Sequence, residues 1–123
     1  MTNKILIVDD QPGIRLLLEE ILKAEGHETI SAKTGKEACR VVKEESLDLI
    51  IMDYNLPVMH GRDVLQFLEE MNYSSPVMII TGDSEESVRK DMDFHFVTHI
   101  ITKPFDIHNL KEMVNGTLVH SRS

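Results

Sequence analysis

The sequence contains a single cysteine, Cys39, and no long apolar run. One cysteine excludes an internal disulfide, which fits the reducing cytoplasm in which we expect this protein to work. No apolar stretch approaches the roughly 20 residues that a membrane-spanning helix needs, and the first ten residues lack the basic start and cleavage site of a signal peptide. We therefore expect neither a disulfide scaffold nor a membrane protein, and we interpret Cys39 as a small packing residue.

Positive charge is also scarce. The 123 residues include 13 Lys and Arg against 21 Asp and Glu, a formal net charge of −8. This balance argues against binding to nucleic acid or to an anionic membrane through bulk charge. At this length, and with 41% apolar residues, we expect residues 1–123 to form one domain around one core, with no output domain.

Short apolar segments alternate five times with longer amphipathic ones. Strands are predicted at Lys4–Val8, Glu28–Ala32, Asp48–Met52, Val77–Thr81 and Val97–Ile101. The first, third and fourth are nearly all apolar, as is typical of a strand covered on both faces. Strict alternation predicts the α/β class with a flavodoxin-like doubly wound fold, in which helices cover both faces of a five-stranded parallel sheet of order 2-1-3-4-5.

The intervening segments have the spacing of helices that face a sheet. Pro12 suits the start of the first helix and Gly26 its end, while Thr34 and Glu37 predict a capping box for the second. A fourth helix is predicted at Ser84–Met92, with few apolar residues and therefore weak docking. The residues expected to face the sheet from the other helices are Ile14, Leu17, Leu18, Ile21, Leu22, Ala38, Val41, Val42, Val64, Phe67, Leu68, Met71, Ile107, Leu110, Met113, Val114 and Leu118.

Unusual polar residues fall where the strands end. Asp9 and Asp10 follow the first strand, Asp53 the third, Thr81 ends the fourth, and Lys103 follows the fifth. In a doubly wound sheet these ends share one edge, where ligands bind. A single Asp in such a place is commonly a turn former, and Asp10 is a candidate cap for the helix that follows. That reading does not account for all five residues together.

Three clustered carboxylates would repel one another unless a cation lay among them. Oxygen ligands favour a hard divalent ion, Mg²⁺ before Zn²⁺. A carboxylate can also act as a nucleophile toward a phosphoryl group, which makes Asp53 a candidate for an acyl phosphate. Lys103 would then neutralise developing charge, and the Thr81 hydroxyl could donate to a phosphoryl oxygen.

Four motifs in this order resemble the receiver domains of bacterial two-component response regulators. They are "VDD" (Val8–Asp10), "DYNLPVMHG" (Asp53–Gly61), "TG" (Thr81–Gly82) and "KPF" (Lys103–Phe105). The resemblance extends from Lys4 to about Val119. It implies that a sensor histidine kinase phosphorylates Asp53 and that the Lys103–Pro104 peptide is cis. It also implies a Mg²⁺ site, in which Mn²⁺ or Ca²⁺ can substitute, formed by Asp9, Asp10, Asp53 and the Asn55 backbone carbonyl.

Within that family, "KILIVDDQPGIRLLLEE" and "KPFDI" resemble the single-domain regulators of the sporulation phosphorelay in endospore-forming bacteria. This narrower resemblance implies a monomer that passes its phosphoryl group to a histidine phosphotransferase, with aspartyl-phosphate phosphatases as further partners. It places partner docking on Gln11, Pro12, Gly13, Ile14, Pro104 and Phe105, where Ile14 is equally well explained as core. Met59, before Gly61, is expected to be exposed at the same face. In this family the positions of Asn55 and Asp83 tune the lifetime of the phosphate, and an amide and an acid there suggest a short one.

Two residues depart from the pattern of those regulators. Pro12 replaces an aromatic residue at the docking rim. Ile100 stands three residues before Lys103, where many receivers have an aromatic residue, while His99 lies one step earlier and should point to the other face. This favours a relay over a switch gated by an aromatic side chain.

Other functions remain open from the sequence. A chemotaxis-type diffusible switch is the main alternative to a relay, followed by a small Mg²⁺-dependent phosphatase that uses an Asp nucleophile. Such a phosphatase wants a second Asp where Asn55 stands. An interaction module without phosphorylation would not need the acidic residues and the lysine, and "DDQPG" would repel a flavin phosphate.

Overall fold

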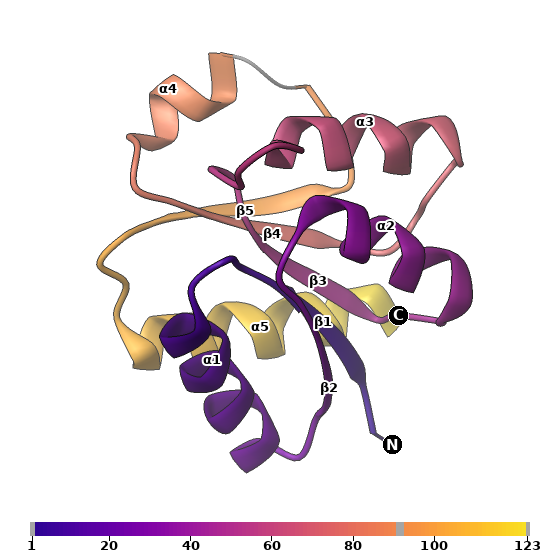
Figure 1. Cartoon of the computed structure of the whole chain (residues 1–123). Coiled ribbons are helices and arrows are strands. Elements are labelled where there is room, and N and C mark those ends of the chain that lie inside the picture. Colours follow the sequence, from indigo (N-terminus) through magenta and orange to yellow (C-terminus); the bar gives the residue numbers. More distant parts are fainter. Residues whose placement is uncertain (1, 91–92, 123) are drawn as a thin grey trace.

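A central parallel sheet organises the molecule. The computed structural model describes residues 2–90 and 93–122, in which strands and helices alternate along the chain (Figure 1). The strands are β1 (Lys4–Val8), β2 (Glu28–Ala32), β3 (Leu49–Asp53), β4 (Val77–Thr81) and β5 (Val97–Thr102), and the helices are α1 (Pro12–Ala24), α2 (Gly35–Glu44), α3 (Gly61–Glu70), α4 (Glu85–Lys90) and α5 (Ile107–Arg122). The sheet order β2-β1-β3-β4-β5 confirms the predicted doubly wound topology.

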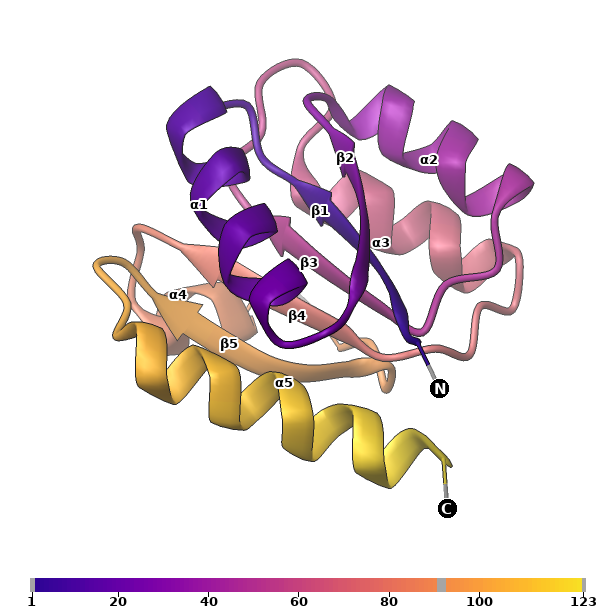
Figure 2. The same cartoon turned by 90° about the horizontal axis from the view of Figure 1, so that it is seen from below.

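The helices form two layers, one on each face of the sheet. Helices α1 and α5 cover one face, and α2, α3 and α4 cover the other, as Figures 1 and 2 both show. Along β1 the side chains alternate between the two cores: Leu6 and Val8 pack toward α2 and α3, whereas Ile5 and Ile7 pack toward α1 and α5. Both faces of the central strands are therefore buried, which is why β1, β3 and β4 are almost wholly apolar.

The ends of the helices follow the local sequence. Pro12 occupies the first turn of α1, where its missing N–H costs nothing. The Thr34 hydroxyl accepts a hydrogen bond from the Glu37 amide at 3.1 Å, which is the Thr34 half of the capping box expected for α2. His60 caps α3: its ring accepts from the Arg62 amide, and the Asp63 carboxylate accepts from the His60 amide. The pattern His-x-x-Asp is a variant of the capping box that we had not predicted.

Several expectations about individual residues are wrong. Strand β3 lies one residue later than predicted and ends on Asp53, and β5 continues to Thr102. Helix α4 begins at Glu85, one residue later than predicted, and is described to Lys90, while the predicted end at Met92 lies outside the described residues. Met71 and Ile107 are 41% and 43% exposed because each stands at a helix end, beyond the part that rests on the sheet.

The loop between β3 and α3 carries the other corrections and the sharpest backbone constraint. Met59 is partly buried against the α2–α3 core, not exposed, because it packs against Gly35. Gly61 donates its amide to the Tyr54 carbonyl at 2.9 Å, and a Cβ there would lie 2.7 Å from that same oxygen. Val58 has φ of 62° with its side chain fully exposed. The loop thus closes tightly at Gly61 and holds a β-branched residue in a left-handed conformation.

Candidate functional site

The five predicted residues do converge on one edge of the sheet. Asp9 follows β1, Asp53 and Thr81 end β3 and β4, and Lys103 follows β5. Asp9, Asp53 and Thr81 are buried, whereas Asp10 is exposed. The cause is topological: parallel strands that lie side by side bring their carboxyl ends to the same edge, although residues 9 and 103 lie far apart in the chain.

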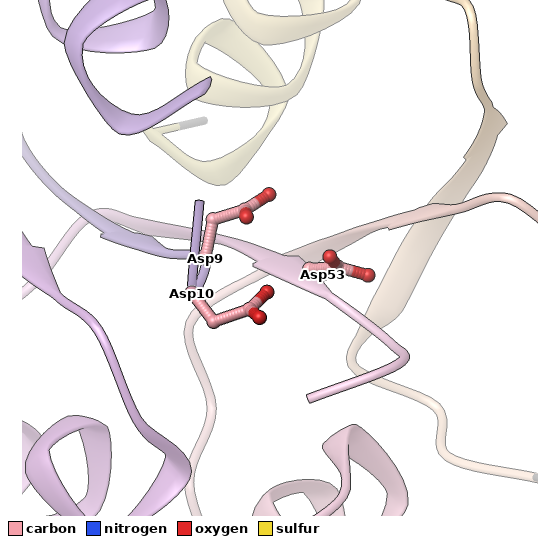
Figure 3. Close-up of side chains that lie close together, drawn as sticks. All are labelled: Asp9, Asp10 and Asp53. Atoms are coloured by element: carbon pink, nitrogen blue, oxygen red, sulfur yellow. The ribbon is translucent and has the colours of Figure 1, made fainter. Parts of the chain in front are cut away.

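Three carboxylates gather there. Asp9, Asp10 and Asp53 each offer one oxygen, and these oxygens all lie within 4.8 Å of one another. Figure 3 shows the three side chains extending beyond the strand ends on the same side. Burial raises the pKa of the Asp9 carboxyl above its ordinary value, and the charge of Asp53 adds to this, against the lowering effects of the Gln11 amide and Lys103. The cluster therefore carries a negative charge that is costly to hold without a cation.

Lys103 supplies part of the compensation. Its ammonium lies 3.2 Å from Asp53 Oδ2 and 3.6 Å from Asp9 Oδ2. The Lys103 amide donates to the Thr81 carbonyl at 2.7 Å, which fixes the chain beyond β5 to the end of β4. The Lys103–Pro104 peptide is cis, as the family resemblance implied.

Asp53 is held on both of its oxygens. Oδ1 accepts a hydrogen bond from the Asn55 amide at 3.0 Å, and Oδ2 accepts from Lys103. Each carboxylate oxygen has a second lone pair, so each can still take a further partner. An oriented, buried carboxylate with free lone pairs and an adjacent ammonium is suited to attack an electrophilic phosphorus.

The Thr81 hydroxyl is surrounded by the loops that follow β3 and β4. Its oxygen accepts from the Asp83 amide at 3.0 Å and from the Asn55 side-chain amide at 3.4 Å. Both interactions use the hydroxyl as an acceptor, which leaves its proton available to donate. Asn55 and Asp83 themselves are exposed, so the structure brings both to Thr81 while keeping them accessible to water.

The expected cap of α1 is wrong in detail. The N-cap residue is Gln11, with no side-chain cap, and its amide donates 2.9 Å to Asp9 Oδ1 rather than to Asp10. Asp9 is thereby oriented, and Asp10 is left to face solvent beside it. A second contact was missed: Arg15 Nη1 donates to the Asp9 carbonyl at 2.7 Å. The sequence offered one indication of this contact, a positively charged residue in the first turn of the helix after Asp9.

The predicted docking residues share the rim but differ in burial. Gln11, Pro12, Gly13 and Pro104 are exposed, whereas Ile14 and Phe105 are partly buried and pack against the α1–α5 core. Leu18 is 1% exposed and belongs to that core. In this structure Ile14 therefore has both a packing contact and an accessible portion, which agrees with the two explanations that the sequence left open.

The donor set fits a hard divalent cation. All three clustered side chains are carboxylates, the ligand type that Mg²⁺ takes in proteins, usually together with waters and substrate phosphates. Asp9, Asp10 and Asp53 would hold it. A bound Mg²⁺ would offset the mutual repulsion of these carboxylates and neutralise charge on phosphoryl oxygens.

Fold and site together define a class: a small α/β signalling domain with a phosphoacceptor-type acidic centre. The chain belongs to the response regulator receiver domain family, whose model matches residues 5–115. It is therefore the receiver domain of a two-component response regulator, and receiver domains act as phosphoacceptors in signalling.

The chain is also similar to individual proteins of known name. It is 36% identical over 119 residues to sporulation initiation phosphotransferase F of Bacillus subtilis, a match that covers 96% of this chain and 95% of the relative. It is 30% identical to the chemotaxis protein CheY of the same organism, covering 96% and 99%. Among solved structures, the response regulator TrrA from Thermotoga maritima, in complex with Mg²⁺-BeF, matches with a TM-score of 0.84 and 31% identity over 94% of this chain and 99% of that one.

No helix within residues 2–90 and 93–122 combines the length and apolarity that a membrane span requires.

Proposed function

We propose that this domain accepts a phosphoryl group on Asp53 from the phosphohistidine of a sensor histidine kinase and passes it to a histidine phosphotransferase, in a relay of the sporulation type. The observation that carries the proposal is the position of Asp53, buried at the end of β3, 3.2 Å from Lys103 and within 4.8 Å of two further carboxylates. The similarity to sporulation initiation phosphotransferase F over almost the full length of both chains supports the relay.

The transfer needs no acid or base from this chain. An Asp53 oxygen attacks phosphorus, an O–P bond forms, and the N–P bond of the donor breaks with its electron pair left on the imidazole nitrogen. Lys103 lies where it can bind a phosphoryl oxygen after the transfer, and Thr81 can donate its hydroxyl proton to another. The reverse attack by a second histidine returns the carboxylate, so one site serves both steps.

The rim residues would dock the partner. Gln11, Pro12 and Gly13 on one side, and Pro104 and Phe105 on the other, flank the Asp53 site without filling it. Pro12 has no N–H and a fixed φ, so a partner meets a rigid apolar surface there rather than an aromatic ring.

A diffusible switch is the second candidate, supported by the CheY relative and by the thin packing of α4, where only Val88 is buried. The residues of β5 argue against a switch of this kind. Ile100 is buried on the α3–α4 side, and His99 points to the other face, where its ring contacts Thr117 of α5. The position that would carry a gating aromatic is thus filled by an aliphatic side chain.

Phosphotransfer tests the proposal. The protein is incubated with Mg²⁺ and acetyl phosphate, and intact mass is measured for the wild type and for Asp53→Asn. One added phosphate on the wild type alone, which then moves to a purified histidine phosphotransferase, is the expected result. A label that decays to free phosphate without moving would favour the switch. No label in the presence of Mg²⁺ would overturn phosphorylation at Asp53.

A further inference from the structure

The outer face of α2 carries a concentration of positive charge in an otherwise acidic protein. A surface hollow of about 690 Å³ is lined by Lys33, Thr34, Lys36, Glu37, Cys39, Arg40 and Lys43, and we call it the α2 basic hollow. Four cations against one carboxylate give it a net charge of +3. Since the chain as a whole carries −8, the remainder carries −11.

These cations form no ion pair with the acidic side chains of the described residues. Lys33, Lys36, Arg40 and Lys43 are all exposed. Only the Lys43 ammonium has an aromatic contact, 5.5 Å from the centre of the Phe67 ring. Lys36, Arg40 and Lys43 follow the i, i+4, i+7 spacing, so like charges are neighbours along one face of the helix and destabilise it.

The place of α2 leaves this face open. In the layer formed by α4, α3 and α2, helix α2 packs on α3 at one flank and lies over the edge strand β2, as Figures 1 and 2 show. Within the described part of the chain, no helix covers its other flank. The hollow begins at the functional edge of the sheet, because Lys33 follows Ala32, whose carbonyl accepts from the Asp9 amide at 3.1 Å.

We propose that the α2 basic hollow docks a short acidic helical segment of a partner protein. The cations from Lys36 to Lys43 span about 10 Å, at roughly 1.5 Å per helical residue, and acids spaced i, i+4, i+7 on a facing helix match them. Charge complementarity limits the occupant. The −11 on the rest of the surface repels a long polyanion such as DNA, whereas a short acidic segment contacts the hollow alone.

Binding of a defined probe tests this proposal. The probe is a fluorescein-labelled 16-residue helical peptide with Glu at i, i+4 and i+7 on one face. The control peptide is identical except for Gln at those three positions. The protein variants are Lys36→Gln/Arg40→Gln and, as a matched control with the same loss of charge, Lys23→Gln/Lys90→Gln. Binding is followed by anisotropy and by amide chemical shifts, at 50 and 200 mM NaCl.

The expected result is binding of the Glu peptide alone, with shifts confined to residues 33–43. Affinity should fall at least tenfold in Lys36→Gln/Arg40→Gln, stay within twofold in the control variant, and weaken with salt. Labelling of Asp53 by acetyl phosphate should be the same in all proteins, which separates this test from that of the proposed function.

Four outcomes would overturn the proposal. They are no binding of the Glu peptide, equal binding by both double variants, equal or tighter binding of a 20-base-pair DNA duplex, and self-association of the wild type alone that the Lys36→Gln/Arg40→Gln substitutions abolish. The last would assign the hollow to a second copy of the chain.

Discussion

At the scale of single residues, Asp10 is the place where stability and the proposed Mg²⁺ binding are expected to make opposite demands. It is the exposed member of the three carboxylates, and its charge opposes those of Asp9 and Asp53. Neutralising Asp10 should therefore remove repulsion from the metal-free protein, and it should weaken Mg²⁺ binding if Asp10 is a ligand as we propose. At this position the stability of the metal-free protein and the binding of Mg²⁺ therefore favour different side chains.

The effect of Asp10→Asn on the free energy of unfolding should consequently be stabilising without Mg²⁺ and destabilising with it. In EDTA we expect the free energy of unfolding to rise by up to about 1 kcal/mol, the usual size of an exposed charge interaction. With Mg²⁺ at 100 times its Kd, the wild type gains about 2.7 kcal/mol and the variant less. Urea denaturation in both buffers measures this. Glu20→Gln, an exposed acid elsewhere on α1, should leave the Mg²⁺ response unchanged, and an Asp10→Asn protein with the full wild-type response would exclude Asp10 as a ligand.

Asn55 and Asp83 lie beside Thr81, which places them to influence attack by water on phosphorylated Asp53. We propose that these exposed polar side chains shorten the lifetime of the phosphate. Asn55→Lys, which puts a longer side chain beside Thr81, and Asp83→Ala, which removes the carboxylate, should each lengthen this lifetime several-fold, as measured by the rate at which label is lost in Mg²⁺. If neither rate changes, these positions do not set the lifetime.

Val58 has a strained backbone conformation and an exposed side chain. Its φ of 62° is unfavourable for a β-branched side chain, and that side chain is fully exposed. Val58→Asn should raise the free energy of unfolding by about 1 kcal/mol, because Asn tolerates the left-handed region. Thermal denaturation measures the change. Val119→Asn, on the exposed face of α5, should be near neutral, and a destabilised Val58→Asn would show that the side chain has an energetic role in the folded protein.

At the scale of secondary-structure elements, the helices differ in how firmly they are held. Within its described residues, Glu85–Lys90, helix α4 buries only Val88, whereas α2 buries five residues, Ala38, Cys39, Val41 and Val42 among them. An element with one buried anchor has little free energy opposing its local opening. If Asp53 is phosphorylated as we propose, the phosphoryl group should therefore bias the position of α4 more easily than that of α2.

Amide hydrogen exchange should reveal this difference. We expect the amides of Val88 and Arg89 to exchange at least tenfold faster than those of Val41 and Val42, measured by NMR in metal-free buffer. Strand amides of β1 and β3 should be the slowest and report global unfolding. Equal protection in α4 and α2 would contradict the inference that α4 is weakly docked.

At the scale of the whole molecule, charge is unbalanced. A net charge of −8 on 123 residues disfavours the compact state through self-repulsion, which salt screens. Added NaCl should therefore stabilise the metal-free protein between 10 and 200 mM, as measured by urea denaturation in EDTA. Glu20→Gln/Glu44→Gln, with less charge to screen, should gain less. A decrease in stability with salt would mean that favourable ion pairs outweigh the repulsion.

The sequence by itself determined the topology, and it predicted which polar residues gather at one edge of the sheet. Apolar runs such as Ile5–Val8 require burial on both faces, and their alternation with helical patterns leaves few arrangements besides the parallel sheet. Because parallel strands end together, Asp9, Asp53 and Lys103 could be assigned to one edge without coordinates. This inference needs only the strand order and the position of each residue at the end of its strand.

Only the tertiary structure decided which neighbours those residues have. Gln11 donates to Asp9 and not to Asp10, Met59 turns inward against Gly35, and Ile107 stays exposed. Periodicity within one element contains no information on where a second element stops covering it, or on how a loop closes. The openness of the α2 basic hollow has the same origin, because it depends on α2 being the last helix of its layer.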